Sequence, residues 1–212
     1  MSSEKKTILV WTDLETTGLD RNNGRILEYG IVFTDLNLNE ITSMEGLVKQ
    51  DVDELRPLMD DYVTKMHTDN GLLDELRKAG PGVGVGYENQ RVICDVAITT
   101  VIKSLQAQHP TASFVLAGST VGFDRGFIEV HMPSFFKQLH YRQLDVSGYK
   151  VGFPEIFGSS TSDAHRAMAD IRESIEVQRK ARRFMTAGHG SLTGRATTVP
   201  QTRPTFDEDD CC

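Results

Sequence analysis

Cysteine is scarce in this sequence of 212 residues, which contains only Cys94, Cys211 and Cys212. So small a number provides no framework of disulfide bonds, and we therefore expect a reducing compartment and a cytoplasmic setting. The adjacent pair at 211–212 has two interpretations: a lipidation signal, or an incidental feature of a tail.

Long hydrophobic runs are also missing. Residues 1–6 are polar, and the apolar stretch that follows them is too short for the core of a signal peptide or for a membrane span. Apolar residues make up 39% of the chain and charged residues 25%, proportions that are typical of a soluble globular protein. We therefore expect no membrane partner.

The chain has no excess of positive charge. Its 23 Lys and Arg residues are outnumbered by 30 Asp and Glu residues, which gives a formal net charge of −7. Because proteins hold long nucleic acids mainly through Lys and Arg on the phosphates, this balance argues against long duplex nucleic acid as a partner. It leaves room for a small basic pocket, and it suits a protein that gathers carboxylates around metal ions.

The spacing of apolar residues predicts a single α/β domain, with a mixed sheet flanked by helices. Strands are expected at 7–13, 25–34, 40–48, 114–117 and 141–145. Because short turns join the first three, these should form an antiparallel meander. Helices are expected at 55–66, 71–78, 87–108, 123–132, 133–139 and 164–184, and a short helix or loop at 147–157.

Two stretches fall outside this pattern. Residues 80–86 hold four glycines and a proline, but no Gly-Lys-Ser/Thr follows, so we interpret them as a linker and not as a phosphate-binding loop. From residue 186 onward large apolar residues are few, and the chain cannot bury enough surface to repay the entropy of ordering. We therefore expect an N-terminal extension at 1–6, a folded domain at 7–185 and a flexible tail at 186–212.

Asp13 and Glu15 are the first candidates for chemistry. They follow a buried strand, in which alternate residues face the same side. Two neighbouring carboxylates repel each other and are costly to desolvate, and a cation held by both removes that cost. The alternatives are a divalent-metal site and an acidic turn that arose by chance.

Three further acidic or basic groups stand at element ends. Asp124 opens a helix after a glycine-bounded turn, where it is either a site residue or a helix cap. His165 and Asp170 are five positions apart, about 140° around a helix, so they cannot share a helical face. If both serve one site, His165 must lie on the preceding loop or at the frayed start of the helix. Asp170 should face the sheet, where a buried acid needs a partner.

Taken together, this pattern resembles the DEDD family of 3′→5′ exonucleases, in its histidine-bearing branch. Asp13 and Glu15 match the first motif of that family, Asp124 the second, and His165 with Asp170 the third. The resemblance implies a ribonuclease H-like fold.

Within this family, the sequence resembles the oligoribonuclease subgroup in further segments. The segments that carry the resemblance are Leu-Met-Asp-Asp-Tyr at 58–62, His-Thr at 67–68, His-Tyr-Arg-Gln-Leu-Asp-Val-Ser at 140–147 and His-Arg-Ala-Met-Ala-Asp-Ile-Arg-Glu-Ser at 165–174. The resemblance covers roughly residues 7 to 185. Departures are Thr16 in place of Met, Tyr62 in place of Trp, and Ser119-Thr120 in place of Asn-Ser. These departures concern substrate preference more than chemistry.

The resemblance implies an enzyme that removes 5′-mononucleotides from the 3′ ends of short RNAs, chiefly dinucleotides. Two Mg²⁺ or Mn²⁺ ions would act on the phosphodiester. Asp13 would bridge both ions, Glu15 and Asp170 would hold one, and Asp124 would act mainly at the other. His165 would be the general base, since an imidazole changes its protonation near neutral pH.

Substrate contacts are also implied by the resemblance. Leu19 would wedge between two bases, Tyr62 would stack on one, and Tyr141 would reach the partner's site in a homodimer. Arg142 is a phosphate candidate, with a salt bridge to Asp145 as the alternative. The full set of expected substrate residues is Leu14, Leu19, Tyr62, His67, Thr120, Tyr141, Arg142 and Ser147.

Two alternative functions remain. One is a broader exonuclease that acts on DNA or longer RNA, and the other is a module that binds dinucleotides without cleaving them.

Overall fold

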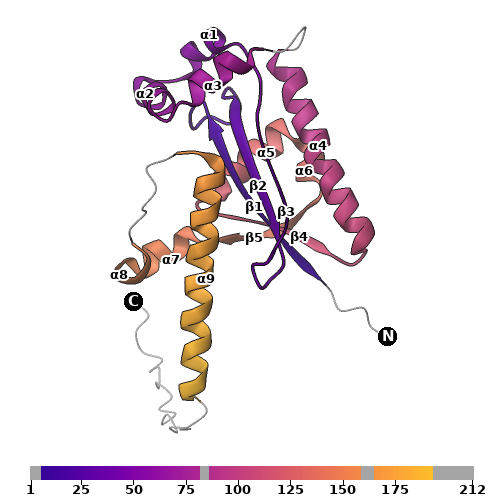
Figure 1. The fold of residues 1–212 in the computed structure, drawn as a ribbon, viewed down its shortest axis with the longest axis vertical. Coiled ribbons are helices and arrows are strands. Elements are labelled where there is room, and N and C mark those ends of the chain that lie inside the picture. Colours follow the sequence, from indigo (N-terminus) through magenta and orange to yellow (C-terminus); the bar gives the residue numbers. More distant parts are fainter. Residues whose placement is uncertain (1–5, 82–85, 159–164, 193–212) are drawn as a thin grey trace, which may run out of the picture.

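The computed structural model describes residues 6–81, 86–158 and 165–192. In this part of the chain one sheet of five strands has the order β3-β2-β1-β4-β5 (Figure 1). The strands are β1 (Thr7–Thr16), β2 (Ile26–Thr34), β3 (Glu40–Leu47), β4 (Ser113–Gly118) and β5 (Leu139–Asp145). β1, β2 and β3 pair antiparallel, whereas β4 runs parallel to both β1 and β5. The predicted mixed sheet and its antiparallel meander are confirmed.

The helices are α1 (Val52–Leu55), the 3₁₀ helix η1 (Arg56–Leu58), α2 (Asp61–Asp69), α3 (Leu72–Ala79), α4 (Tyr87–Gln108), α5 (Gly122–His131), α6 (Pro133–Phe136), α7 (Ser147–Gly152), α8 (Pro154–Phe157) and α9 (Ala167–Leu192). Figure 1 shows α9 on one side of the sheet and α4, α5 and α6 on the other. None of the helices in the described part of the chain is long and apolar enough to cross a membrane.

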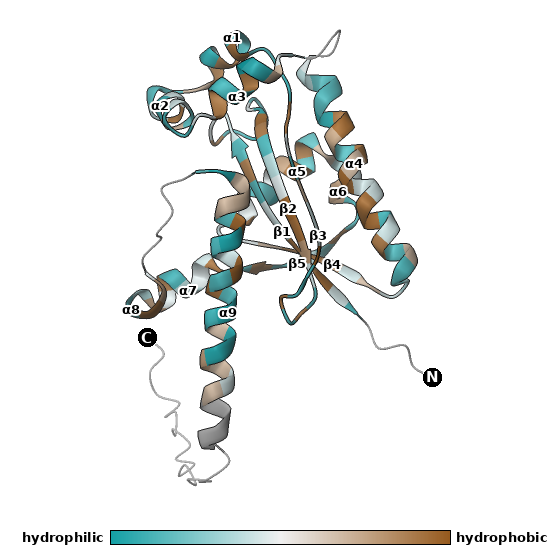
Figure 2. Cartoon of the chain, in the orientation of Figure 1, coloured by the Kyte–Doolittle hydropathy of each residue, from teal (hydrophilic) through white to brown (hydrophobic). Residues whose placement is uncertain are grey.

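β1 is central because both of its faces are apolar. Ile8 and Val10 pack into a core with residues of α4, α5 and α6, whereas Leu9 and Trp11 pack against Ile171 and other residues of α9. Figure 2 shows hydrophobic residues along the middle strands and hydrophilic residues recurring along α9. Alternate residues of β1 thus supply two separate cores, which fixes the orientation of the strand and of the acids at its end.

The helix predicted at 55–66 is wrong in its bounds. α1 ends at Leu55 and η1 at Leu58, Met59 is extended, and a new helix begins at Asp61 and continues through His67. The carboxylate of Asp60 caps this helix by accepting from the N–H of Val63 at 2.8 Å. A capping side chain of this kind favours a new start over a continuous helix, and it escapes an argument based on apolar spacing.

α9 differs from its prediction at both ends. It begins at Ala167, three positions after the predicted start at 164, and it continues to Leu192, past the expected domain boundary at 185. The remainder of the expected tail, the pair Cys211-Cys212, most of the N-terminal extension and the centre of the glycine-rich segment lie outside the described residues.

Candidate functional site

The candidate site lies at the carboxyl end of β1. Asp13 and Glu15 project from the same face of that strand and meet Asp170, which lies in the first turn of α9. One ligand oxygen from each of the three carboxylates lies within 4.8 Å of the others. Two elements far apart in the sequence therefore bring three acids to one point.

Burial changes the protonation of these acids. It raises the pKa of Glu15 from 4.5 to about 9, and the charges of Asp13 and Asp170 add to the shift. Burial also raises the pKa of Asp13 from 3.8 to about 7, with a further contribution from Asp170. A bound cation would reverse this preference for the neutral form. Because every donor is a carboxylate oxygen, the set fits Mg²⁺ or Mn²⁺ better than Zn²⁺.

Asp124 stands beside this cluster at the start of α5. It is 3% exposed, and its Oδ1 accepts from the N–H of Leu14 at 3.0 Å. Burial raises the pKa of Asp124 well above its ordinary value, and the charge of Asp13 adds to the effect. Asp124 is not the N-cap residue of α5, because Val121 holds that position, but the Asp124 carboxylate accepts from its own backbone N–H in the first turn of the helix.

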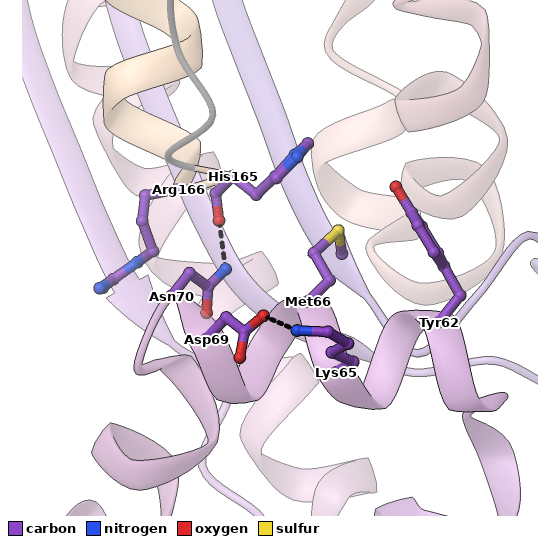
Figure 3. A pocket seen from close by; sticks show the side chains of 7 residues that line it. All are labelled: Tyr62, Lys65, Met66, Asp69, Asn70, His165 and Arg166. Atoms are coloured by element: carbon purple, nitrogen blue, oxygen red, sulfur yellow. Dashed lines mark hydrogen bonds and ion pairs between the residues drawn. The ribbon is translucent and has the colours of Figure 1, made fainter.

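His165 lies on the segment before α9, as the angular argument from the sequence requires. It lines a cavity of about 380 Å³, here called the metal cavity, together with Asp13, Ser119, Thr120, Lys150, Asp170, Glu173 and Ser174. It also lines a second cavity of about 570 Å³ against α2, here called the α2 cavity, together with Tyr62, Lys65, Met66, Asp69, Asn70 and Arg166 (Figure 3). His165 thus lines both the metal cavity and the α2 cavity.

Three expected substrate residues are exposed apolar side chains. Leu19, on the loop after β1, is 88% exposed; Tyr62, on α2, is 72% exposed; and Tyr141, on β5, is 73% exposed. Large apolar groups held in water are available to stack on bases. Tyr62 rises from α2 at the rim of the α2 cavity in Figure 3.

The expected phosphate residues divide into two groups. Thr120 lines the metal cavity, and its N–H donates to Asp145 Oδ1 at 3.0 Å. The hydroxyl of Ser147 donates to the same Asp145 oxygen at 2.6 Å, so one acid holds both residues. Arg142 instead lines a different cavity, beside α9 and the first strand, and its guanidinium lies over the ring of Tyr141.

His67 and Leu14 are both buried. The Nε2–H of His67 donates to the carbonyl oxygen of Thr16 at 2.9 Å, and its Nδ1 lies 3.9 Å from Glu15 Oε2. The side chain of His67 is fully buried, and desolvation lowers its pKa. Leu14 is 6% exposed and meets Asp124 through its backbone. In this structure both residues are buried next to the acids, His67 beside Glu15 and Leu14 beside Asp124.

The sequence analysis missed Lys150. It lies on α7 and lines the metal cavity, and its ammonium is 2.9 Å from Glu173 Oε1. A weak signal was available, because Lys150 follows Ser147 by three positions and residues so spaced share one side of a helix. A cation on the wall of an otherwise acidic cavity is suited to a phosphate group.

Comparison with known proteins identifies the family of this chain. The exonuclease family profile RNase_T matches residues 10–178. An oligoribonuclease of Corynebacterium glutamicum is 35% identical and spans 94% of this chain and 92% of its own length. A probable oligoribonuclease of Dictyostelium discoideum is also 35% identical, over 82% of this chain and 88% of its own.

Solved structures share the fold. Exonuclease I of Methylocaldum szegediense is 18% identical with a TM-score of 0.52, over 84% of this chain and 40% of its own. E. coli exonuclease I in complex with a dT13 oligonucleotide is 16% identical with a TM-score of 0.54, over 88% of this chain and 43% of its own. This chain thus spans about two fifths of those proteins. From the family profile and the relatives that match nearly full length, the chain belongs to the exonuclease family, in its oligoribonuclease group.

Proposed function

We propose that this protein is a 3′→5′ exoribonuclease that degrades short oligoribonucleotides, chiefly dinucleotides, to 5′-mononucleotides. The observation that carries the proposal is the meeting of Asp13, Glu15 and Asp170 within 4.8 Å, where Asp13 and Asp170 line one cavity together with His165. Metal-binding carboxylates beside a general base are the groups that phosphodiester hydrolysis needs.

The metal is proposed to be a pair of Mg²⁺ or Mn²⁺ ions. Asp13, Glu15 and Asp170 would hold one ion, and Asp13 with Asp124 would hold the other. Bound ions of this kind stabilise charge on the phosphate and on the leaving oxygen. The support is the all-oxygen donor set and the high pKa of the buried acids, which a cation would relieve.

His165 is proposed to take the proton from the attacking water. The support for this role is that His165 lines the same cavity as Asp13 and Asp170. Thr120 and Lys150 line the same cavity and would bind phosphate oxygens. Leu19 and Tyr62 would contact the bases, and the size of the cavities suits a short substrate.

We also propose a cytoplasmic homodimer. β5 is one of the two edge strands of the described sheet, and Tyr141 on it is exposed, so both are available to a second copy. A sedimentation measurement that returns the mass of one chain at working concentration would argue against the dimer.

A length series tests the proposed activity. RNA and DNA of two to about twenty nucleotides, labelled at the 5′ end, are digested with Mg²⁺ or Mn²⁺. The expected result is fastest turnover of RNA dinucleotides, with slower cleavage of longer RNA and of DNA. Equal rates on long DNA would support the broader exonuclease instead. Tight dinucleotide binding without turnover in either metal would support a binding module.

A further inference from the structure

We propose that Glu28, Asn70, Glu75 and Arg166, here called the Arg166 network, position His165 for catalysis. The inference rests on the proposed role of His165 as general base. It adds residues that are not among the three clustered acids and that act through the backbone next to the histidine, although Asn70 and Arg166 also line the α2 cavity.

The backbone of His165 is in a conformation that needs support. Its φ is +40°, in the left-handed region that residues other than glycine rarely adopt. Such a residue persists only where the surrounding structure holds it, and strain of this kind collects at functional sites. The structure must therefore contain contacts that hold this backbone.

Arg166 provides the first of these contacts. Its guanidinium binds Glu28 of β2, with Nη2 to Oε1 at 2.8 Å and Nε to Oε2 at 3.1 Å. The same group binds Glu75 of α3, with Nη2 to Oε2 at 2.8 Å and Nη1 to Oε1 at 3.0 Å. One planar guanidinium thus joins two carboxylates from separate elements, a geometry that a lysine would not reproduce.

Two backbone contacts complete the network. The Nδ2 of Asn70, at the end of α2, donates to the carbonyl oxygen of His165 at 2.6 Å. The N–H of Ala167 donates to Glu28 Oε2 at 3.2 Å. Figure 3 shows the side chains of His165 and Arg166 pointing in opposite directions from this short segment. The network therefore holds the main chain on one side and leaves the imidazole free on the other.

The position of Glu75 makes it the best residue to test. Its side chain is 46% exposed, so its ion pair with Arg166 contributes little to global stability. Glu28 is a poor choice, because it raises the pKa of Asp13 and Glu15 and its removal would disturb the metal cluster directly. A general base must lie within about 3 Å of the atom that carries the proton, so a small displacement of His165 should slow the chemical step.

The experiment compares Glu75→Ala with Asp74→Ala. Asp74 is the neighbouring exposed acid on α3 and pairs only locally, with Arg77 at 2.8 Å, so it is a matched control. On an RNA dinucleotide, Glu75→Ala is expected to lower kcat by roughly three- to tenfold, with KM, Mn²⁺ affinity and Tm near those of the control. Glu75→Gln, which keeps one acceptor oxygen, should recover part of the rate.

A double-mutant cycle separates positioning from a general effect on structure. In a His165→Ala background, Glu75→Ala should cause no further loss. An equal loss in both backgrounds, or no loss in either, would overturn the inference while leaving the proposed function intact. Near-normal turnover by His165→Ala alone would overturn the role of His165, and the inference would fall with it.

Discussion

At the scale of single residues, the site contains buried acids whose ionised forms are disfavoured next to one another. Glu15 is almost fully buried, and burial together with neighbouring charge raises its pKa to about 9. Asp170 contributes to the shift of both Asp13 and Glu15. Because neighbouring carboxylates make ionisation of one another more costly, we expect the three to act as one unit toward the proposed metal ion.

Asp170→Asn tests this unit at one position. The substitution keeps the size of the side chain but removes one negative ligand, so turnover of an RNA dinucleotide should fall by at least about a hundredfold, the scale expected when several kcal/mol of metal stabilisation are lost. Mn²⁺ affinity, measured by calorimetry, should fall as well. Glu155→Gln on α8, an exposed acid away from the cavity, is the control and should be unchanged. Unaltered Mn²⁺ binding by Asp170→Asn would remove Asp170 from the ligand set.

Among elements, the start of α9 decides where His165 and Asp170 lie. Gly30 of β2 stands opposite Asp13 in the sheet and faces the first turn of α9. A Cβ at this position would lie 2.9 Å from Ile171 Cδ1 and 3.1 Å from the backbone carbon of Ala167. The absence of a side chain here lets the helix pack directly on the sheet.

Gly30→Val should therefore push α9 away from β2. We expect the free energy of unfolding to fall by about 1–3 kcal/mol, as for other overpacked cores, and kcat to fall in the fraction that remains folded. Urea denaturation and dinucleotide kinetics measure the two effects. Gly152→Val on α7 is the control, since a Cβ there meets nothing within 4 Å. A variant as stable and as active as that control would show that close packing at Gly30 is not needed.

The same elements show what the sequence could and could not predict. Asp13 and Glu15 were predictable because strand alternation is local. The helix predicted at 164–184 included His165, and angular spacing placed this residue before that helix or at its frayed start only if it shares a site with Asp170. The hydrogen bond from Leu14 to Asp124 joins residues 110 positions apart, and Arg166 meets Glu28 across 138 positions. Such contacts depend on the packing of whole elements, so neither they nor the place of Lys150 could be predicted from local patterns.

On the scale of the whole molecule, the buried acids should couple the proposed metal binding to folding. In the metal-free chain the pKa of Asp13 is about 7 and that of Glu15 about 9, whereas the ordinary values of 3.8 and 4.5 apply when the chain is unfolded. Between these values the folded state binds more protons than the unfolded state. The contribution of the two acids to stability is therefore present at low pH and is lost as pH rises through the folded pKa values.

This coupling predicts the pH dependence of stability. The metal-free chain, prepared with a chelator, should lose free energy of unfolding relative to an Asp13→Asn/Glu15→Gln double variant as pH rises from about 5 to about 9. The comparison with the variant cancels groups that titrate elsewhere. Saturating Mg²⁺ should stabilise the unmodified chain more at high pH than at low pH, because protons and the ion compete for the same oxygens. Urea denaturation across this range measures both effects. If the difference in free energy of unfolding between the unmodified chain and the double variant did not change with pH, the raised pKa values of Asp13 and Glu15 would be contradicted.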